Sequence, residues 1–294
     1  MLIGNGFTID FGSRYGLNPS APLSHFGKRN LSYEKYIHKL PYIQNELFQL
    51  AQYEPNEYEA IERFMNSRNY NWDKDCQLRR FLSLSYASFQ IYADSKNIVN
   101  WKWTKWLQQN YKDLIFVVSF NYDLVFEKAL ETSNIHFFRT GSLENQTGIP
   151  IFKPHGSIDF ETNTSEYSVE DRWQMTTLLQ DNGKVTTVPK EDWLEPRLEA
   201  DIIPPHKDNY QRILSWVKNG IDQFNTRGKD INLLIIVGHS YGEADRQEVD
   251  QYLVSLKPDT KIIIVDPKPN PDLLKKIDEL NLKRLPTNAA GLPW

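Results

Sequence analysis

The segment Leu233–Gly242 reads LLIIVGHSYG, a run of five apolar residues that passes directly into a polar loop bounded by glycines. A continuous apolar run of this length is typical of a parallel strand that is buried on both faces. A helical pattern follows at about residues 244–256, and a second apolar run, Ile262–Val265, ends at Asp266. Strands that alternate with helices in this way predict an open parallel sheet.

The same alternation occurs in the rest of the chain. The apolar run Leu114–Val118 predicts another buried strand, and a minimal first strand is expected at residues 1–3. Shorter strands are expected at residues 135–138 and 151–152. A short helix is expected after the segment 119–123 and ends at about residue 130. Further helices are expected at 209–224 and 271–280. The stretch 160–205 is expected to be loops with one short helix at 171–179. Together these elements predict an α/β fold with a Rossmann-like open parallel sheet.

One long stretch near the start of the chain interrupts this alternation. Its apolar residues, such as Leu40, Ile43 and Leu47, recur at the three- and four-residue spacing of a helix face. We therefore expect a single domain over residues 1–294 that carries a helical insertion at about residues 30–110.

The composition narrows the class of protein. With 294 residues and 40% hydrophobic residues, the chain can bury a large core. Its net charge of −4 gives no reason to expect direct binding of nucleic acid. Tryptophans at positions 101, 103 and 106 leave two interpretations, a stacking face for nucleic acid or a packing or subunit contact, and the second is favoured.

Metal sites and membrane segments are not indicated. The single cysteine, Cys76, can form neither an intrachain disulfide nor a cysteine-based zinc site, and the histidines do not fall at ligand spacing. We expect no metal. The chain begins without a basic region followed by an apolar core, and its apolar runs are of strand length, so we expect a cytoplasmic protein without a membrane segment.

Polar motifs follow the predicted strands at residues 4–7, 119–123, 153–157 and 238–242, and Asp266 makes a fifth. The carboxyl ends of parallel strands meet at one edge of a sheet, where ligands bind. Each motif alone is explained by a turn that ends a strand, but five together predict one shared site.

The first motif, Gly4-Asn5-Gly6, suits a phosphate-binding turn before a helix. The dinucleotide fingerprint of dehydrogenases requires a third glycine where this chain has Ile9, so a dehydrogenase is disfavoured. From this motif alone, an ordinary strand-to-helix turn fits equally well.

The second and third motifs offer groups for catalysis. Asn121 can hydrogen bond to ribose hydroxyls or to a water, whereas Asp123 can either contact a ligand or cap the next helix. His155 lies in a tight turn between a proline and a glycine and can act as a base near neutral pH.

The loop Gly238–Gly242 also fits G-x-S-x-G, the nucleophile elbow of α/β-hydrolases, with Asp266 where that fold places its acid. Such enzymes need a histidine after the acid, and the chain has none after His239. Ser240 is therefore expected to bind phosphate or ribose and not to act as a nucleophile.

In this order the motifs resemble those of sirtuin-like bacterial defence proteins and of related abortive-infection proteins that open with Gly-Asn-Gly-Phe. The resemblance implies an NAD site in which Asn121 is essential, Asp123 lies near the nicotinamide and His155 is the general base. It also implies contacts to the bound NAD from a further set of residues: Gly4, Asn5, Gly6, Phe7, Gly238, Ser240 and, beside the adenine ribose, Asp266.

The departures from sirtuin deacylases turn the expectation toward another reaction. Phe120 replaces the usual glutamine, and the four zinc cysteines are missing. In these features the chain resembles the sirtuin-like defence proteins. This resemblance implies an NAD glycohydrolase that releases nicotinamide and linear or cyclic ADP-ribose. A non-catalytic nucleotide-binding sensor or scaffold and an NAD-dependent deacylase are the alternatives.

The resemblance also implies regulation, because constant destruction of NAD is toxic. A separate partner chain, such as a HerA-type ATPase or a short Argonaute, or self-assembly into a homo-oligomer, would switch the enzyme on during phage infection. The aromatic helical insertion is the expected docking surface.

Overall fold

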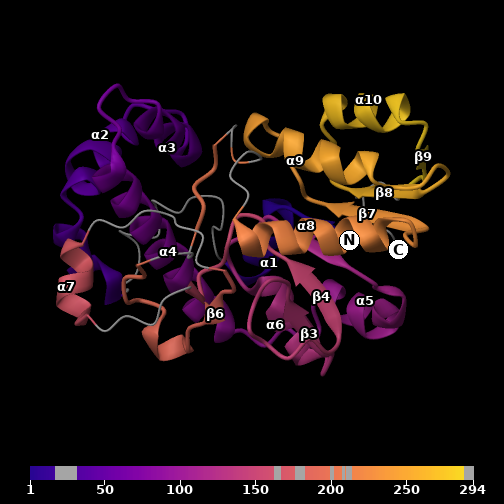
Figure 1. Cartoon of the computed structure of the whole chain (residues 1–294), viewed down its shortest axis with the longest axis horizontal. Helices are drawn as coiled ribbons and strands as arrows, with labels where there is room; N and C mark the ends of the chain where they lie inside the picture. The colour runs from indigo at the N-terminus through magenta and orange to yellow at the C-terminus, as the bar shows by residue number, and fades with distance from the viewer. Residues whose placement is uncertain are drawn as a thin grey trace.

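Seven parallel strands form the central sheet in the computed structural model, which describes residues 1–16, 32–161, 167–175, 183–198, 202–206, 209 and 214–287 (Figure 1). The order across the sheet is β3-β4-β2-β1-β7-β8-β9. The strands are β1 (Leu2–Ile3), β2 (Val117–Ser119), β3 (Phe137–Arg139), β4 (Ile149–Phe152), β7 (Leu233–Val237), β8 (Lys261–Val265) and β9 (Lys283–Arg284). The predicted α/β fold with a Rossmann-like parallel sheet is confirmed.

The shortest buried strand, β1, lies at the centre of the sheet. Leu2 is in register with Val118 of β2 on one side and with Ile236 of β7 on the other. After β1 the chain builds one half of the sheet and later returns to build the other half from β7, so the direction of strand addition reverses between β1 and β7. Ligands of open α/β sheets bind at the carboxyl edge of such a reversal.

Helices cover both faces of the sheet. One face carries α1 (Asn5–Tyr15), α5 (Lys102–Asn110) and α6 (Val125–Thr132), and the other carries α8 (Ser215–Gly228), α9 (Glu243–Val254) and α10 (Pro271–Glu279). Trp101 and Trp103 are buried in the core on the α1 side of the sheet, where both pack against Phe7 of α1. This placement confirms helix packing as the role of these two tryptophans.

From residue 32 to β2 the chain is largely helical. It contains η2 (Ser32–Lys39), η3 (Ile43–Leu47), α2 (Phe48–Leu50), α3 (Glu57–Met65), α4 (Trp72–Asp94), α5 and η4 (Tyr111–Asp113). The first part of α4 packs in a core of its own with α3, whereas Phe89 and Ala93 at its end reach the core beneath the sheet. The elements from η2 to the start of α4, called the helical region below, stand beside the sheet in Figure 1.

The helix starts fall into two groups. Asn56, Asn71 and Asn270 cap α3, α4 and α10 through their side chains, as expected of asparagine at this position. By contrast, α1 and α9 begin after Gly4 and Gly242 without a side-chain cap. The positive ends of their dipoles thus have no side-chain partner, although Gly6 N and Phe7 N at the start of α1 donate to the main-chain oxygens of Gly238 and Gly4.

Several boundaries differ from those predicted. β2 begins at Val117 and not at Leu114, and its first pairing is between Val117 and Ile151 of β4. Neither β9 nor the antiparallel pair β5 (Phe160–Glu161) and β6 (Thr186–Thr187), which lies in the stretch expected to be loops, was predicted. That stretch also holds the turn η5 (Lys190–Asp192).

The two other expected helices are found in part. α7 (Val169–Gln174) begins near the predicted residue 171, and the predicted end at residues 176–179 lies outside the described residues. α8 begins at Ser215, and residues 210–213 of the predicted helix are likewise outside them. Among the described residues, no helix combines the length and the apolar character that a membrane crossing requires.

Candidate functional site

A cavity of about 750 Å³ lies at the carboxyl ends of β1, β2, β4, β7 and β8. Each of the five motifs singled out in the sequence contributes to its wall. The predicted site residues that line it are Gly4, Asn5 and Gly6, Asn121 and Asp123, His155, Gly238 and Ser240, and Asp266. The volume falls in the range of small-molecule sites. The edge of the sheet at which its order reverses therefore carries a cavity large enough for a small molecule.

Phe7 is the predicted site residue that does not line the cavity. Its side chain is fully buried on the other side of α1, with ring centroids 5.0 Å from Trp101, 5.3 Å from Trp103 and 5.7 Å from Phe126. The expected contact between Phe7 and a ligand is thus wrong. The ring anchors α1 to the sheet because the helix turns residue 7 away from the strand edge.

The glycines of the first motif bring two loops into contact. A Cβ atom on Gly6 would lie 2.4 Å from Gly238 Cα, and one on Gly4 would lie 2.6 Å from His239 Cα. Gly6 N donates a hydrogen bond to Gly238 O (2.8 Å), and Gly4 N donates to Val237 O (2.9 Å). These N–H groups are therefore not free for a phosphate. The glycines serve first to join the β1 and β7 loops.

Asn121 fastens the same turn from the side of β2. Its Nδ2 donates to Gly4 O (3.1 Å) and to Thr8 Oγ1 (3.0 Å), and Thr8 Oγ1 donates to Asp123 Oδ2 (2.9 Å). The amide nitrogen of Asn121 is thus engaged within the protein. Within the described part of the chain no hydrogen bond reaches its Oδ1, so this oxygen is the group that a ligand can use.

Asp123 takes the helix-starting role that the sequence left open. Its Oδ1 accepts a hydrogen bond from Val125 N (3.0 Å), the first residue of α6, while its Oδ2 accepts from Thr8. Burial raises the pKa of Asp123, against the lowering effects of Lys153 and of these hydrogen bonds. Both oxygens are occupied, so Asp123 holds the wall of the cavity in place.

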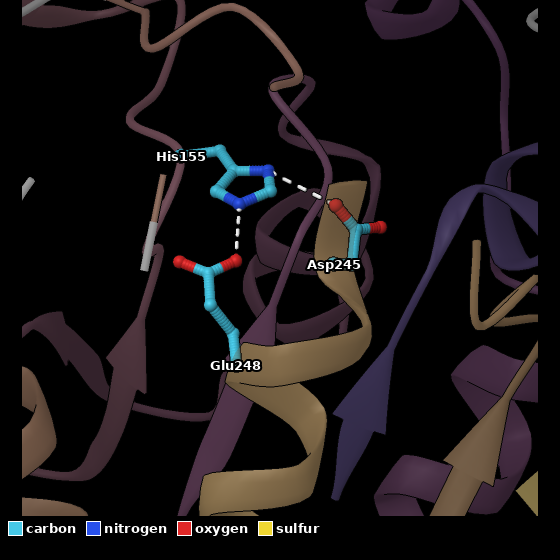
Figure 2. A group of neighbouring side chains, drawn as sticks. All are labelled: His155, Asp245 and Glu248. Atoms are coloured by element: carbon cyan, nitrogen blue, oxygen red, sulfur yellow. Dashed lines mark hydrogen bonds and ion pairs between the residues drawn. The ribbon is translucent and has the colours of Figure 1, made fainter. Parts of the chain in front are cut away.

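His155 is held by two carboxylates of α9 (Figure 2). Its Nε2 lies 2.6 Å from Glu248 Oε2, and its Nδ1 lies 3.8 Å from Asp245 Oδ1. Asp245 and Glu248 are three residues apart and therefore project from the same face of the helix toward the imidazole.

The two carboxylates set the protonation of His155. Burial by itself would lower the pKa of His155, but the attraction of Glu248, its hydrogen bond and the nearby Asp245 raise the pKa to about 9. At neutral pH the free protein carries an imidazolium here. The role of general base that the resemblance implies therefore does not fit His155 in this state.

A second histidine reaches the same carboxylate. His239 Nδ1 accepts a hydrogen bond from Tyr241 N (3.0 Å), which assigns the ring proton to Nε2, and Nε2 lies 3.5 Å from Asp245 Oδ2. Burial lowers the pKa of His239, so the ring is neutral at pH 7. Phe120 packs edge-on against both imidazoles, with ring centroids 5.2 Å from His155 and 4.7 Å from His239.

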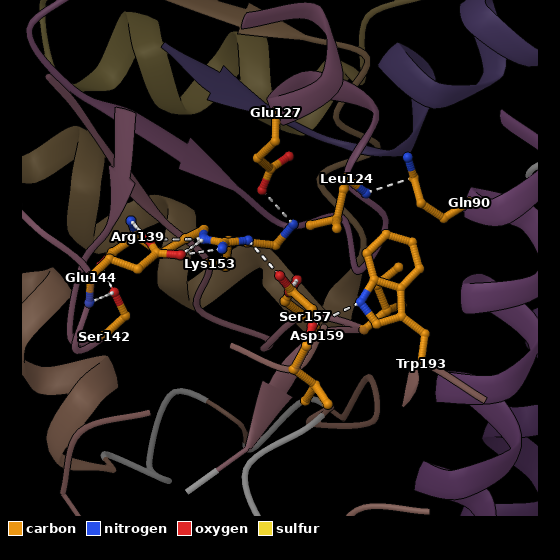
Figure 3. Close-up of polar contacts among 12 residues, drawn as sticks. Gln90, Leu124, Glu127, Arg139, Ser142, Glu144, Lys153, Ser157, Asp159 and Trp193 are labelled. Carbon is orange, nitrogen blue, oxygen red and sulfur yellow. Dashed lines mark hydrogen bonds and ion pairs between the residues drawn. The ribbon is translucent and has the colours of Figure 1, made fainter. Parts of the chain in front are cut away.

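A buried lysine ties the second and third motifs together. Lys153 Nζ donates to Asp123 O (2.7 Å) and to Glu127 Oε1 (3.0 Å), and the lysine is 1% exposed (Figure 3). Arg139 pairs with Asp159 (2.7 Å), which accepts from Ser157 of the third motif (2.6 Å). These contacts fix the loop on which His155 stands.

The helical region forms one wall of the cavity through Tyr58, Glu59, Glu62, Met65 and Asn66. Tyr58 OH accepts from Asn5 Nδ2 (3.1 Å) in the glycine turn and lies 3.2 Å from Tyr86 OH on α4. The helical region is thus in direct contact with the turn that begins α1.

Sequence reasoning missed several residues of the site. Asp245, His239 and His206 line the cavity, and Glu248 is hydrogen bonded to His155. The available signal was the pair of acids three residues apart at the start of a helix that follows a motif. His206 follows two prolines in a stretch without a pattern, and no signal pointed to it.

The arrangement around Ser240 does not fit a nucleophile elbow. The left-handed backbone conformations fall on Gly238 (φ 54°) and Tyr241 (φ 53°) and not on Ser240. His239 Nδ1 bonds the main chain, and within the described part of the chain Ser240 Oγ has no hydrogen bond to a histidine. The serine hydrolase alternative thus loses its geometry as well as its residue order.

One group among the described residues has the composition of a metal site. His155, Asp245 and Glu248 each offer one atom that could bind a metal ion, and these three atoms lie within 4.8 Å of one another. The short contact from His155 Nε2 to Glu248 already satisfies both groups, so the arrangement is explained without a metal ion.

The sequence was also compared with known proteins. It matches no model of a protein family, and it matches no curated protein. What the protein does is therefore inferred from the cavity, its charged groups and its motifs.

Proposed function

We propose that the protein binds NAD in the cavity at the strand ends and cleaves the bond between nicotinamide and ribose. The observation that carries the proposal is the meeting of the five motifs in one cavity, with Asn121 and His155 in the loops that follow the neighbouring strands β2 and β4. Together with the resemblance of these motifs to sirtuin-like defence proteins, this placement favours a nucleotide as the substrate over an ester substrate of a serine hydrolase.

The groups in the wall suit the parts of NAD. The uncapped start of α1 presents the positive end of its dipole to the cavity, where a pyrophosphate is stabilised. Asp266, at the end of β8, has the position at which an acidic residue binds a ribose hydroxyl. Asn121 Oδ1 would hold a hydroxyl of the second ribose or the attacking water.

Cleavage would pass through an oxocarbenium-like state at the ribose, with nicotinamide leaving as a neutral molecule. Asp245, the carboxylate beside His155 that lines the cavity, would stabilise the positive charge that develops on the ribose. His155 would keep Asp245 in place as its charged partner and would itself be held by Glu248.

Control of the activity would come through the helical region. It supplies one wall of the cavity and touches Asn5 through Tyr58, so a partner chain or a second copy bound there would act directly on the glycine turn. We propose that such contact, during phage infection, switches on the depletion of NAD.

The test is release of nicotinamide. The protein is incubated with NAD, alone and with the product of the neighbouring gene, and free nicotinamide is measured. We expect the rate of release to fall at least 100-fold in Asn121→Ala. The substitution removes the hydrogen bond from Asn121 to Gly4 in the glycine turn and the proposed contact of Asn121 with the ribose. His155→Ala is expected to act similarly.

The controls are Asn219→Ala and His136→Ala, which change exposed residues outside the cavity. They should release nicotinamide at the wild-type rate. Absence of release under every condition would contradict the glycohydrolase proposal. NAD binding without release would instead support a nucleotide sensor.

A further inference from the structure

Among His155, Asp245 and Glu248, Asp245 is the most exposed side chain, and it lines the cavity together with His155. Its side chain is 21% exposed, whereas the side chains of His155 and Glu248 are 4% and 8% exposed. Asp245 lines the cavity, but Glu248 lies behind the imidazole and is not part of the lining. A ligand at the strand ends can therefore contact Asp245 and His155 but not Glu248, and Asp245 offers it the most exposed group of the three.

Two histidines hold this carboxylate from opposite oxygens. Oδ1 lies 3.8 Å from His155 Nδ1, and Oδ2 lies 3.5 Å from His239 Nε2. The bond from Tyr241 N to His239 Nδ1 leaves the proton on Nε2, so this ring can only donate toward Asp245. Apart from Asp245, His239 Nε2 has no polar partner among the described residues, and it is buried.

The remaining carboxylates of the cavity are less suited to catalysis. Both oxygens of Asp123 are bonded to Thr8 and Val125. Asp266 accepts a hydrogen bond from Lys268 N at the end of β8. The other acidic residues of the wall are solvent-exposed and lie on α3 or at the first position of α9: Glu59, Glu62 and Glu243.

We propose that Asp245 is the catalytic carboxylate of this site and accepts the proton of the attacking water. The inference rests on the proposed cleavage of NAD. The C1′–N bond breaks and its electron pair goes to the nicotinamide nitrogen. The water oxygen bonds to C1′, one water proton passes to the Asp245 carboxylate, and that proton then goes to solvent. His155 and His239 are positioning residues, which act through Asp245.

A paired substitution separates catalysis from structure. Asp245→Asn keeps the size of the side chain but removes its basicity, and Asp245→Ala also opens space for a small anion. We expect nicotinamide release to fall about 100-fold or more in both variants, mainly in kcat, with KM changed by less than about threefold. Azide should restore release in Asp245→Ala by attacking C1′ itself, giving ADP-ribosyl azide. The matched control is Asp222→Asn, an exposed carboxylate on α8.

The pH profile of the wild type gives a second readout. With Asp245 as the base, kcat is constant through neutral pH and declines above about pH 9, where His155 loses its proton. A kcat that instead rises with the deprotonation of His155 would overturn the role of Asp245 and return it to His155.

The remaining outcomes separate the two proposals. An active wild type with an equally active Asp245→Ala overturns the inference alone. The same holds if Asp245→Ala loses activity without rescue by azide and with a thermal midpoint that has also fallen, because the defect is then structural. A wild type that releases no nicotinamide overturns the proposed function and this role with it.

Discussion

His155 Nε2 lies 2.6 Å from Glu248 Oε2, and both side chains are buried, His155 at the wall of the cavity and Glu248 outside its lining. The pKa of His155 is raised from 6.5 to about 9 in the folded protein. Folding therefore favours the protonated ring. The stabilisation from this pair is fully present below the unfolded pKa of 6.5 and is lost as the pH rises through about 9.

The first prediction concerns stability against pH. Between pH 6.5 and 9 the free energy of unfolding should decrease, and the contribution of His155 to this decrease is at most about 3 kcal/mol. Urea denaturation at a series of pH values measures it. Glu248→Gln should flatten the slope in this window, since the neutral amide no longer favours the imidazolium. A slope unchanged by this substitution would show that other groups cause the pH dependence.

The position of the site was predictable from the sequence because parallel strands bring their carboxyl ends together by topology alone. The apolar runs before Gly238 and Ser119 placed these motifs at strand ends, and the cavity lies there. The α/β class followed from the same runs. Strand lengths were less predictable, since the extent of β2 depends on its pairing with β1 and β4, which lie far from it in the sequence or were expected with other bounds.

The partners of His155 could not be predicted in this way. Asp245 and Glu248 occur in a helix pattern, where acidic residues usually face solvent. Only the packing of α9 over the ends of β4 and β7 turns their common face toward the imidazole. The protonation of His155 depends on this packing, so its expected role as a base could not be judged from the local sequence.

The second prediction concerns the buried lysine of the third motif. Lys153→Met removes the cation between Asp123 O and Glu127, and leaves the Glu127 carboxylate buried without its partner. We expect a loss of about 3–5 kcal/mol in the free energy of unfolding. Chemical denaturation measures this loss. Addition of Glu127→Leu to Lys153→Met should recover much of it, because no unpaired charge then remains. Two losses that simply add would contradict the pairing.

The third prediction concerns the contact between the two glycine loops. Gly6→Ala places a Cβ 2.4 Å from Gly238 Cα, so the loops after β1 and β7 must separate. We expect a loss of about 2 kcal/mol or more in stability, together with weaker nucleotide binding. Gly242→Ala is the matched control for stability, since its Cβ would meet only Ser240 Oγ at 3.6 Å. Equal losses in the two variants, measured by thermal denaturation, would show that the close approach of Gly6 is unimportant.

The last prediction concerns metal ions at the cluster of His155, Asp245 and Glu248. A metal ion would have to displace the proton that His155 holds with a pKa of about 9, and this competition weakens binding at neutral pH. We therefore expect Mg²⁺, Mn²⁺ or EDTA to leave both the thermal midpoint and nicotinamide release unchanged. Raising the pH to about 9 lowers the cost of displacing the proton, so any weak binding should appear there first. A Mn²⁺-dependent rise in thermal midpoint at pH 7 that His155→Ala abolishes would contradict this expectation and identify the cluster as a metal site.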